Sequence, residues 1–298
     1  MIEYTVNTND EGQTIFKFVK KVQKDMSLSI IYKLFRTGNV KINNKKVKDH
    51  SVILNVGDNV KIYSKIAIEQ NRDEFVPIPY KELKIIFEDT NILIADKPSN
   101  LEVHSDINDS LDLMVKSYLF KKKEYQPNKE NSFVVSHVHR IDKLTKGLVI
   151  YAKNKKALDY FLEVIKDKNK IEKRYIARLE KIYKGPNEVK GFMKYDSDIQ
   201  KSLFFPEYIE EEYGIKSCEM SVEFRRGVAD IVLGSGRKHQ IRAVMGYYNS
   251  PIEGDFRYGA KRSMKREIAL VAKSVAFFNF ESDFEYLNNK SFVSKYEV

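Results

Sequence analysis

The residue best suited to chemistry in this chain is Asp142, a carboxylate set among basic side chains. His139 and Arg140 precede it, Lys143 follows it, and the apolar segment 148–152 begins soon afterwards. A loop can present such a carboxylate to a ligand while the strand beside it holds the loop in place. An isolated aspartate is more often a turn residue that accepts a backbone N–H. The charged neighbours favour a reactive carboxylate here.

Two other segments place charged side chains where they could line a pocket. Lys173 and Tyr175 are two residues apart in the strand-like segment 172–179, so both project from one face of an extended strand. Arg242 closes the basic segment 236–242 and could pair with a carboxylate through two parallel hydrogen bonds. The alternatives are an ordinary half-buried core tyrosine and an arginine on a helix surface.

Four sequence blocks, in this order, resemble the motifs of the RluA-type pseudouridine synthases. The blocks are Lys-Pro-Ser-Asn at 97–100, His-Arg-Ile-Asp at 139–142 with Thr-Lys-Gly at 145–147, Gly-Arg-Lys-His-Gln-Ile-Arg at 236–242, and Gly-Asp-Phe-Arg-Tyr-Gly at 254–259. The Lys-x-Tyr segment around Tyr175 is similar to a family strand as well. The resemblance covers the chain from Leu83 onward.

Besides Ile141, which replaces Leu and conserves its volume, the chain departs from the family pattern at four positions. Asn100 stands where Gly is usual, and Asn tolerates a positive φ better than most residues. Lys146 replaces a small hydroxyl residue, Lys238 replaces Thr, and Val244 occupies the position of a second His. None of these changes removes the carboxylate.

The resemblance implies conversion of uridine into pseudouridine in RNA, without a cofactor. The N-glycosidic bond is cleaved and the uracil is rejoined through carbon 5, a task for which a carboxylate is suited. Asp142 would be the nucleophile, by attack on the sugar or by assisting elimination, and Arg242 would orient it. Tyr175 would stack on the uracil and could accept the carbon 5 proton. Arg140 would fill the space left by the everted uridine.

The remaining site residues receive supporting roles from the same resemblance. His139 and His239 are expected to fix loops, because a titrating imidazole has no evident task in this isomerisation. Lys173 is expected to share the substrate pocket with Tyr175.

A metal centre is the weaker interpretation of the central segment. His137 and His139 would share one face of a strand, but a third ligand at a usable spacing is missing, and Cys218 is the only cysteine. A metal-dependent nuclease using these histidines and Asp142 is therefore a minor hypothesis, and we predict no metal. Walker and dinucleotide glycine patterns are also missing, so nucleotide hydrolysis and hydride transfer have no support.

The positive charge is concentrated near the N-terminus. The chain has a net charge of +10, and residues 12–49 contain ten Lys and Arg against two Asp, a net +8. A basic module on a nearly neutral body is typical of a nucleic-acid anchor. Thr14 and Ser27 could cap two short helices, and Asn43 and Asn44 could form a hairpin turn.

This pattern, over residues 11–63, resembles the S-four-type RNA-binding domain. The resemblance implies contacts to RNA phosphates from basic residues, for which the candidates are Lys17, Lys20, Lys21, Arg36 and Lys41. The alternative is a solvated lysine-rich helix face. Residues 1–11 are expected to be an extended arm and residues 64–81 a linker.

Strands are expected at 83–89, 91–98, 172–179, 217–224 and 229–233, with helices at 110–123 and from Asn154 onward. The family resemblance implies an α+β fold with a mixed, mostly antiparallel central sheet, flanking helices and a cleft at Asp142. We predict two domains, residues 1–75 with the RNA-binding module and its linker, and residues 76–298 with the catalytic unit.

The predicted function is isomerisation of specific uridines in structured RNA, with large-subunit ribosomal RNA as the expected target by analogy with family members that carry the N-terminal module. The alternative is a non-catalytic RNA-binding or ribosome-assembly factor on the same scaffold, suggested by the four departures. We expect the protein to be cytoplasmic, because no apolar run is long enough to span a membrane. We also expect it to be a monomer.

Overall fold

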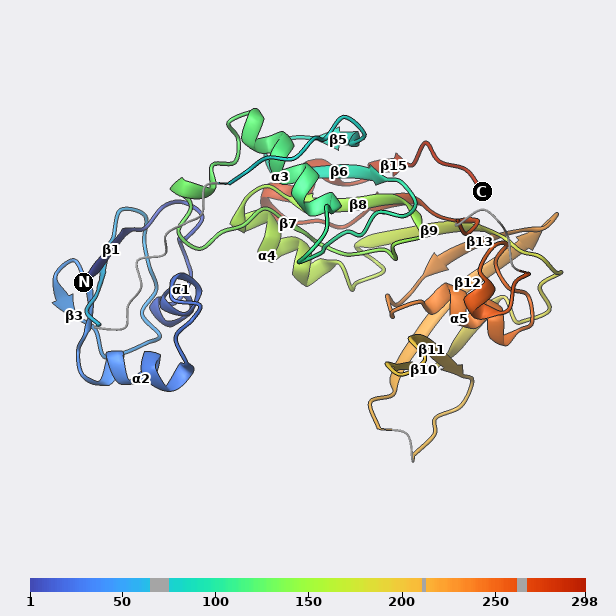
Figure 1. Cartoon of the computed structure of the whole chain (residues 1–298), viewed down its shortest axis with the longest axis horizontal. Helices are drawn as coiled ribbons and strands as arrows, with labels where there is room; N and C mark the ends of the chain where they lie inside the picture. The colour runs from blue at the N-terminus through green and yellow to red at the C-terminus, as the bar shows by residue number, and fades with distance from the viewer. Residues whose placement is uncertain (65–74, 211–212, 262–266) are drawn as a thin grey trace.

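The computed structural model describes residues 1–64, 75–210, 213–261 and 267–298. These residues form a small N-terminal module and a larger body, which follow each other along the long axis of the molecule (Figure 1). The predicted linker falls mostly outside the described residues, and the predicted boundary at residue 75 stays a prediction. Within the described ranges, no helix combines the length and the apolar character that crossing a membrane requires.

The N-terminal module is a four-stranded sheet covered by two helices. Its elements are β1 (Ile2–Thr5), α1 (Ile15–Val22), α2 (Leu28–Arg36), β2 (Val40–Ile42), β3 (Lys45–Lys46) and β4 (Asn59–Ile62), in the sheet order β1-β4-β2-β3. The side chain of Thr14 accepts a hydrogen bond from the backbone N–H of Lys17, and Asn43 and Asn44 both adopt positive φ in the hairpin turn. The two helices and the hairpin are confirmed.

The larger body is built on one sheet of eleven strands. Its elements are β5 (Lys84–Glu88), β6 (Ile92–Lys97), α3 (Leu111–Lys121), η1 (Pro127–Lys129), β7 (Ser136–His137), β8 (Lys146–Ala152), α4 (Lys155–Val164), β9 (Ile171–Arg178), β10 (Glu188–Asp196), β11 (Lys201–Phe205), β12 (Lys216–Arg225), β13 (Val228–Leu233), α5 (Gln240–Tyr247), η2 (Phe256–Tyr258), β14 (Leu270–Phe277), η3 (Ser282–Leu287) and β15 (Ser291–Val293). The main path is β11-β10-β12-β13-β9-β14-β8-β6-β5, with β15 on β14 and β7 on β8. Among the described pairings only β14 with β8 is parallel, which confirms the mixed, mostly antiparallel α+β fold.

Helices cover both faces of the central strands. Every residue of β6 is buried. Leu93 and Ala95 pack into the cluster that contains α3 and α5, whereas Ile92 and Ile94 pack into the cluster that contains α4. Because alternate residues of a strand point to opposite faces, α3 and α4 lie on opposite sides of the sheet.

Gly147 permits the close approach of the one parallel pair. It lies beside Ala272 with a φ of +115°, and a Cβ atom at this position would lie 2.3 Å from the carbonyl oxygen of Ala272. Only glycine fits such a contact in this backbone conformation. The contact fixes the start of β8, directly after the loop that carries Asp142.

The module is docked onto the larger body by a buried carboxylate. Asp10 is fully buried and accepts hydrogen bonds from Ser132 Oγ at 2.6 Å and from Asn131 Nδ2 at 2.7 Å. Asn9 Oδ1 accepts the backbone N–H of Lys155 at 2.9 Å, in the first turn of α4. The module therefore contacts both α4 and the segment that leads toward the Asp142 loop.

Replacing Asp10 with alanine should loosen this docking. Ser132 and Asn131 would lose a shared acceptor, at a cost of about 1–3 kcal/mol. We expect faster amide hydrogen exchange at residues 129–132 and in the first turn of α4. The exposed Asp25→Ala removes the same charge elsewhere in the module and is the control; equal exchange in the two variants would argue against a docked module.

Candidate active site

Asp142 lies in the loop between β7 and β8, facing an arginine on α5. Arg242 Nη1 donates to Asp142 Oδ2 at 3.2 Å. The Asp142 side chain is 24% exposed, whereas that of Arg242 is 5% exposed. The carboxylate is thus held by a buried cation while one side of it stays open.

Arg242 is itself held by a second carboxylate, Asp255. Its Nε and Nη2 atoms donate to the two oxygens of Asp255 at 2.7 and 2.9 Å. Burial disfavours the charged guanidinium, but the bonds to Asp255 and the charge of Asp142 raise the pKa of Arg242 overall. Asp255 was not singled out from the sequence, although it belongs to the Gly-Asp-x-x-Tyr-Gly block at 254–259 that could have indicated it.

The segment after β6 fixes the backbone of the Asp142 loop. Lys97 Nζ donates to the carbonyl of Lys143 at 3.0 Å and also to those of Pro98 and Leu101. Ser99 Oγ donates to the carbonyl of Leu144 at 2.9 Å. Burial lowers the pKa of Lys97 to about 7, against the opposing charge of Asp142.

The turn beside Ser99 depends on Asn100, which stands where the family has glycine. Asn100 has a φ of 64°, so this residue adopts the left-handed conformation that was expected of it.

Tyr175 completes a narrow slot with the carboxylate and the guanidinium. The side chains of Asp142, Tyr175 and Arg242 all line a cavity of about 80 Å³. Burial, and to a smaller extent the charge of Asp142, raises the pKa of the Tyr175 phenol above its ordinary value. A neutral phenol suits stacking on a base and disfavours the proton-accepting role suggested for Tyr175.

The histidines of the site are neutral at neutral pH. His139 Nε2 accepts the backbone N–H of Ile150 at 3.3 Å, and burial lowers the pKa of His139 to about 3. Burial also lowers the pKa of His239 to about 4, although Asp142 opposes this shift. His239 Nδ1 lies 2.8 Å from the hydroxyl of Tyr258. Both imidazoles are therefore placed to hold loops.

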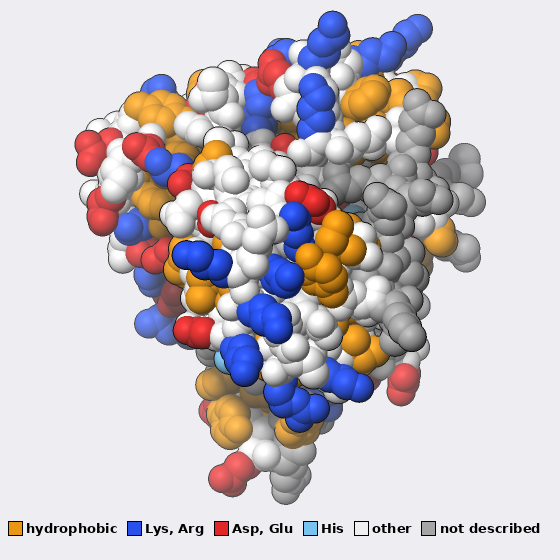
Figure 2. Space-filling model, turned by 90° about the vertical axis from the view of Figure 1, so that its left-hand side faces the viewer, with side chains coloured by type: hydrophobic (Ala, Val, Ile, Leu, Met, Phe, Trp, Pro, Cys, Tyr) orange, Lys and Arg blue, Asp and Glu red, His pale blue; other side chains and the backbone are white. Residues whose placement is uncertain are grey.

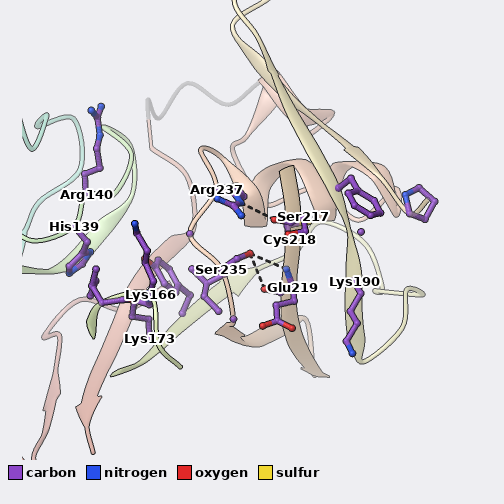
Figure 3. Close-up of a pocket in the computed structure, with 18 residues that line it drawn as sticks. His139, Arg140, Lys166, Lys173, Lys190, Ser217, Cys218, Glu219, Ser235 and Arg237 are labelled. Atoms are coloured by element: carbon purple, nitrogen blue, oxygen red, sulfur yellow. Dashed lines mark hydrogen bonds between the residues drawn. The ribbon is translucent and has the colours of Figure 1, made fainter. Parts of the chain in front are cut away.

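Arg140 and Lys173 lie on a larger cavity beside the slot. Arg140 is exposed and projects outward at the edge of this cavity, whereas Lys173 Nζ donates to the carbonyl of Ile165 at 2.7 Å (Figure 3). Burial lowers the pKa of Lys173. His137 is turned elsewhere, with Nδ1 2.9 Å from Asp112 Oδ1. In the described part of the chain, no three His, Cys, Asp or Glu side chains form a group that could hold a metal ion.

The basic candidates of the N-terminal module differ in their surroundings. Lys17, Lys20 and Arg36 are exposed, and the end of the molecule that the module forms presents many Lys and Arg side chains (Figure 2). Lys41 Nζ lies 4.7 Å from the ring centre of Tyr63. Burial and the nearby Lys155 lower the pKa of Lys21, which places Lys21 at the junction with α4.

Residues 91–247 match the family model described as RNA pseudouridylate synthase. An uncharacterized RNA pseudouridine synthase of Mycoplasma capricolum subsp. capricolum is 43% identical over 296 residues, which cover 97% of this chain and 96% of the relative. Ribosomal large subunit pseudouridine synthase C of Buchnera aphidicola subsp. Acyrthosiphon pisum is 30% identical, with coverage of 85% of this chain and 79% of that protein.

The fold is similar to that of the solved human protein called RNA pseudouridylate synthase domain containing 4. The TM-score is 0.52 at 17% identity, and the match covers 71% of this chain and 87% of that chain.

Replacing Asp255 with asparagine should lower stability and kcat more than replacing an aspartate of an exposed ion pair does. Asp255 is 1% exposed, and its loss as a charge leaves the buried Arg242 with Asp142, which is partly exposed, as its carboxylate partner. We expect the free energy of unfolding to fall by about 3–5 kcal/mol and kcat to fall with it. The control is Asp230→Asn, which weakens the exposed pair with Arg174 and should change stability by less than about 1 kcal/mol. Equal effects of the two substitutions in denaturant titrations would contradict the role of Asp255.

Lys97 should make stability depend on pH in the alkaline range. The folded protein releases the Lys97 proton near pH 7, whereas the unfolded chain retains it up to about pH 10.5, so unfolding takes up a proton between these values. Stability therefore rises with pH in this window. From pH 7 to pH 9 the free energy of unfolding of the wild type should rise by about 2 kcal/mol relative to Lys97→Met. Parallel stability curves for the two proteins would show that folded Lys97 keeps its proton.

Proposed function

Because the chain belongs to the RNA pseudouridylate synthase family, we propose that it converts specific uridines of large-subunit ribosomal RNA into pseudouridine, with Asp142 as the reactive group. We assign this role to Asp142 because it forms an ion pair with the buried Arg242 beside the ring of Tyr175. The ribosomal target is supported by the name of the Buchnera relative and by the basic N-terminal module.

Asp142 is placed to act on a nucleoside that enters from the open side of the slot. Its Oδ2 atom is bound by Arg242, and within the described residues Oδ1 has no hydrogen-bond partner. Oδ1 is thus the atom that would meet the sugar or the base. The two routes, attack on the sugar and assistance to elimination, both require an ionised carboxylate at this position.

Uridine must leave its stack to reach Asp142. Tyr175 offers its ring to the everted uracil, and Arg140 is exposed at the edge of the adjoining cavity, where it could occupy the vacated position in the RNA.

The N-terminal module is proposed to act as the S-four-type RNA anchor. Lys17, Lys20 and Arg36 are exposed and would contact phosphates, which carry no sequence information but position the RNA. We also propose that the protein acts as a monomer in the cytoplasm. A chain with one cysteine, buried Cys218, is compatible with a reducing compartment.

Asp142→Asn should abolish pseudouridine formation and leave RNA binding intact. The bidentate pair of Arg242 with Asp255 remains in this variant, so the site should keep its shape. We expect a loss of roughly a thousandfold or more in turnover. In cells that lack the gene, the wild type should restore the missing pseudouridines of large-subunit ribosomal RNA, and Asp142→Asn should not.

The same experiment separates the two parts of the proposal. A fully active Asp142→Asn protein would remove Asp142 from the reaction. Pseudouridines that return only in transfer RNA would overturn the ribosomal target while leaving the enzyme activity in place.

A further inference from the structure

A second, larger cavity adjoins the slot of Asp142. Its volume is about 720 Å³, and it shares Arg140, Tyr175, Leu233, Gly236 and Arg237 with the 80 Å³ slot. One side is formed by the Asp142 loop and β9, and the other by β10, β12 and the segment 233–237 (Figure 3). We call this space the lateral cavity. Its volume lies in the range of pockets that enclose a whole small ligand, and it extends away from the carboxylate.

The lateral cavity is strongly basic. Five cations line it, namely Arg140, Lys166, Lys173, Lys190 and Arg237. Its one acidic lining residue is Glu219, whose Oε1 atom lies 3.0 Å from Lys168 Nζ. A pocket with this charge excess favours an anion such as a phosphate group.

Arg237 is oriented for such an anion. Its Nε donates to the carbonyl of Ser217 at 2.8 Å, and its backbone N–H donates to Gln240 Oε1 at 3.0 Å. Within the described residues, neither terminal nitrogen of this guanidinium has a hydrogen-bond or ion-pair partner. A guanidinium that is fixed by Nε and free at both terminal nitrogens can bind two phosphate oxygens at once.

The remaining wall is apolar and suits the face of a base. Ile165, Cys218 and Leu233 are buried and line the lateral cavity together with Phe192 and Pro206. Burial raises the pKa of the Cys218 thiol to about 11, so this side chain is an uncharged part of the wall. RNA-binding proteins commonly receive unstacked bases on apolar and aromatic side chains next to cations that bind the backbone.

We propose that the lateral cavity binds the nucleotide next to the target uridine in the same RNA strand. The base lies against Ile165, Cys218 and Leu233, and its phosphate is bound by Arg237. This inference rests on the proposed function, because it takes the target uridine to occupy the slot at Asp142. Two adjacent nucleotides are then everted together, and the enzyme selects sites where the neighbour can leave its stack as well as the uridine.

The first test measures binding with the Asp142→Asn protein and a large-subunit ribosomal RNA fragment that the wild type converts. Two further fragments lack only the base of the nucleotide before or after the target uridine. One of these abasic fragments should bind roughly ten- to a hundredfold more weakly than the intact RNA, because a base contact is lost. Equal affinity for all three fragments would overturn the inference.

The second test fills the lateral cavity from its exposed rim. Ser217 lies on β12 opposite Phe192 on β10, lines the cavity and is exposed, so Ser217→Trp adds a ring at the rim of the cavity. It should weaken binding of the intact RNA about as much as removal of the base does. For the abasic fragment that already binds more weakly, Ser217→Trp should not lower the affinity any further. Additive losses would contradict a shared site.

The third test concerns the phosphate contact. Arg237→Ala should raise KM for the intact RNA about tenfold or more with a smaller change in kcat. Arg225→Ala is the matched control, because Arg225 is an exposed arginine at the far end of β12 and should leave KM unchanged. Identical KM values for the two variants would reject Arg237 as a ligand. If the wild type converts no uridine in any large-subunit ribosomal RNA fragment, the proposed function is rejected, whereas a converted fragment whose binding is unchanged by loss of either neighbouring base rejects this inference alone.

Discussion

The site depends on a guanidinium that is shared by two carboxylates. A buried arginine without a counter-charge would be costly, and Asp255 supplies that counter-charge with both oxygens. The third donating nitrogen of Arg242 is then available for Asp142. As a result, the direction in which Asp142 faces is set by α5 and by the turn that carries Asp255. Both lie more than ninety residues further along the chain.

The loop of Asp142 is restrained at its backbone, so its carboxylate needs few bonds of its own. Lys97 and Ser99 bind the carbonyls that follow Asp142, and Gly147 brings β8 against Ala272 on β14. The loop is thus clamped between the end of β6 and the one parallel strand pair. This arrangement leaves Asp142 Oδ1 without a hydrogen-bond partner among the described residues, as suits a carboxylate proposed to react with a ligand.

Local signals in the sequence predicted much of the fold. The caps at Thr14 and Asn154 accept the expected backbone N–H, whereas Ser27 precedes α2 as predicted but its side chain makes no capping hydrogen bond. Other elements depend on contacts that no local pattern carries. Residues 2–5 were expected to be an arm and instead form β1, because they pair with β4 almost sixty residues later. The strands β10, β11 and β14 were not predicted. Their sequences mix polar and apolar residues, and the residues at which they begin and end are set by pairing with neighbouring strands.

The same distinction applies to the site. Asp142, Tyr175 and Arg242 were singled out because their residue types and spacing match motifs, and the structure brings them to one slot. Asp255 was missed because its task is visible only once α5 and η2 lie side by side. Lys21 was expected on a free surface, but the docking of the module turns it toward Lys155.

For the RNA-anchoring role that we propose for the module, the way in which it is docked bears on how RNA is selected. Among the described residues, its side-chain hydrogen bonds to the larger body come from Asn7, Asn9, Asp10 and Gln13, so exposed lysines such as Lys17 and Lys20 take no part in them. A flexible tether would let the anchor bind phosphates at many distances from the target, which adds affinity with little selection. A docked anchor fixes that distance. An RNA then makes both sets of contacts only if its fold places a phosphate-rich surface and an extrudable uridine at this one separation. The choice of target therefore depends on the shape of the RNA as well as on the sequence around the uridine.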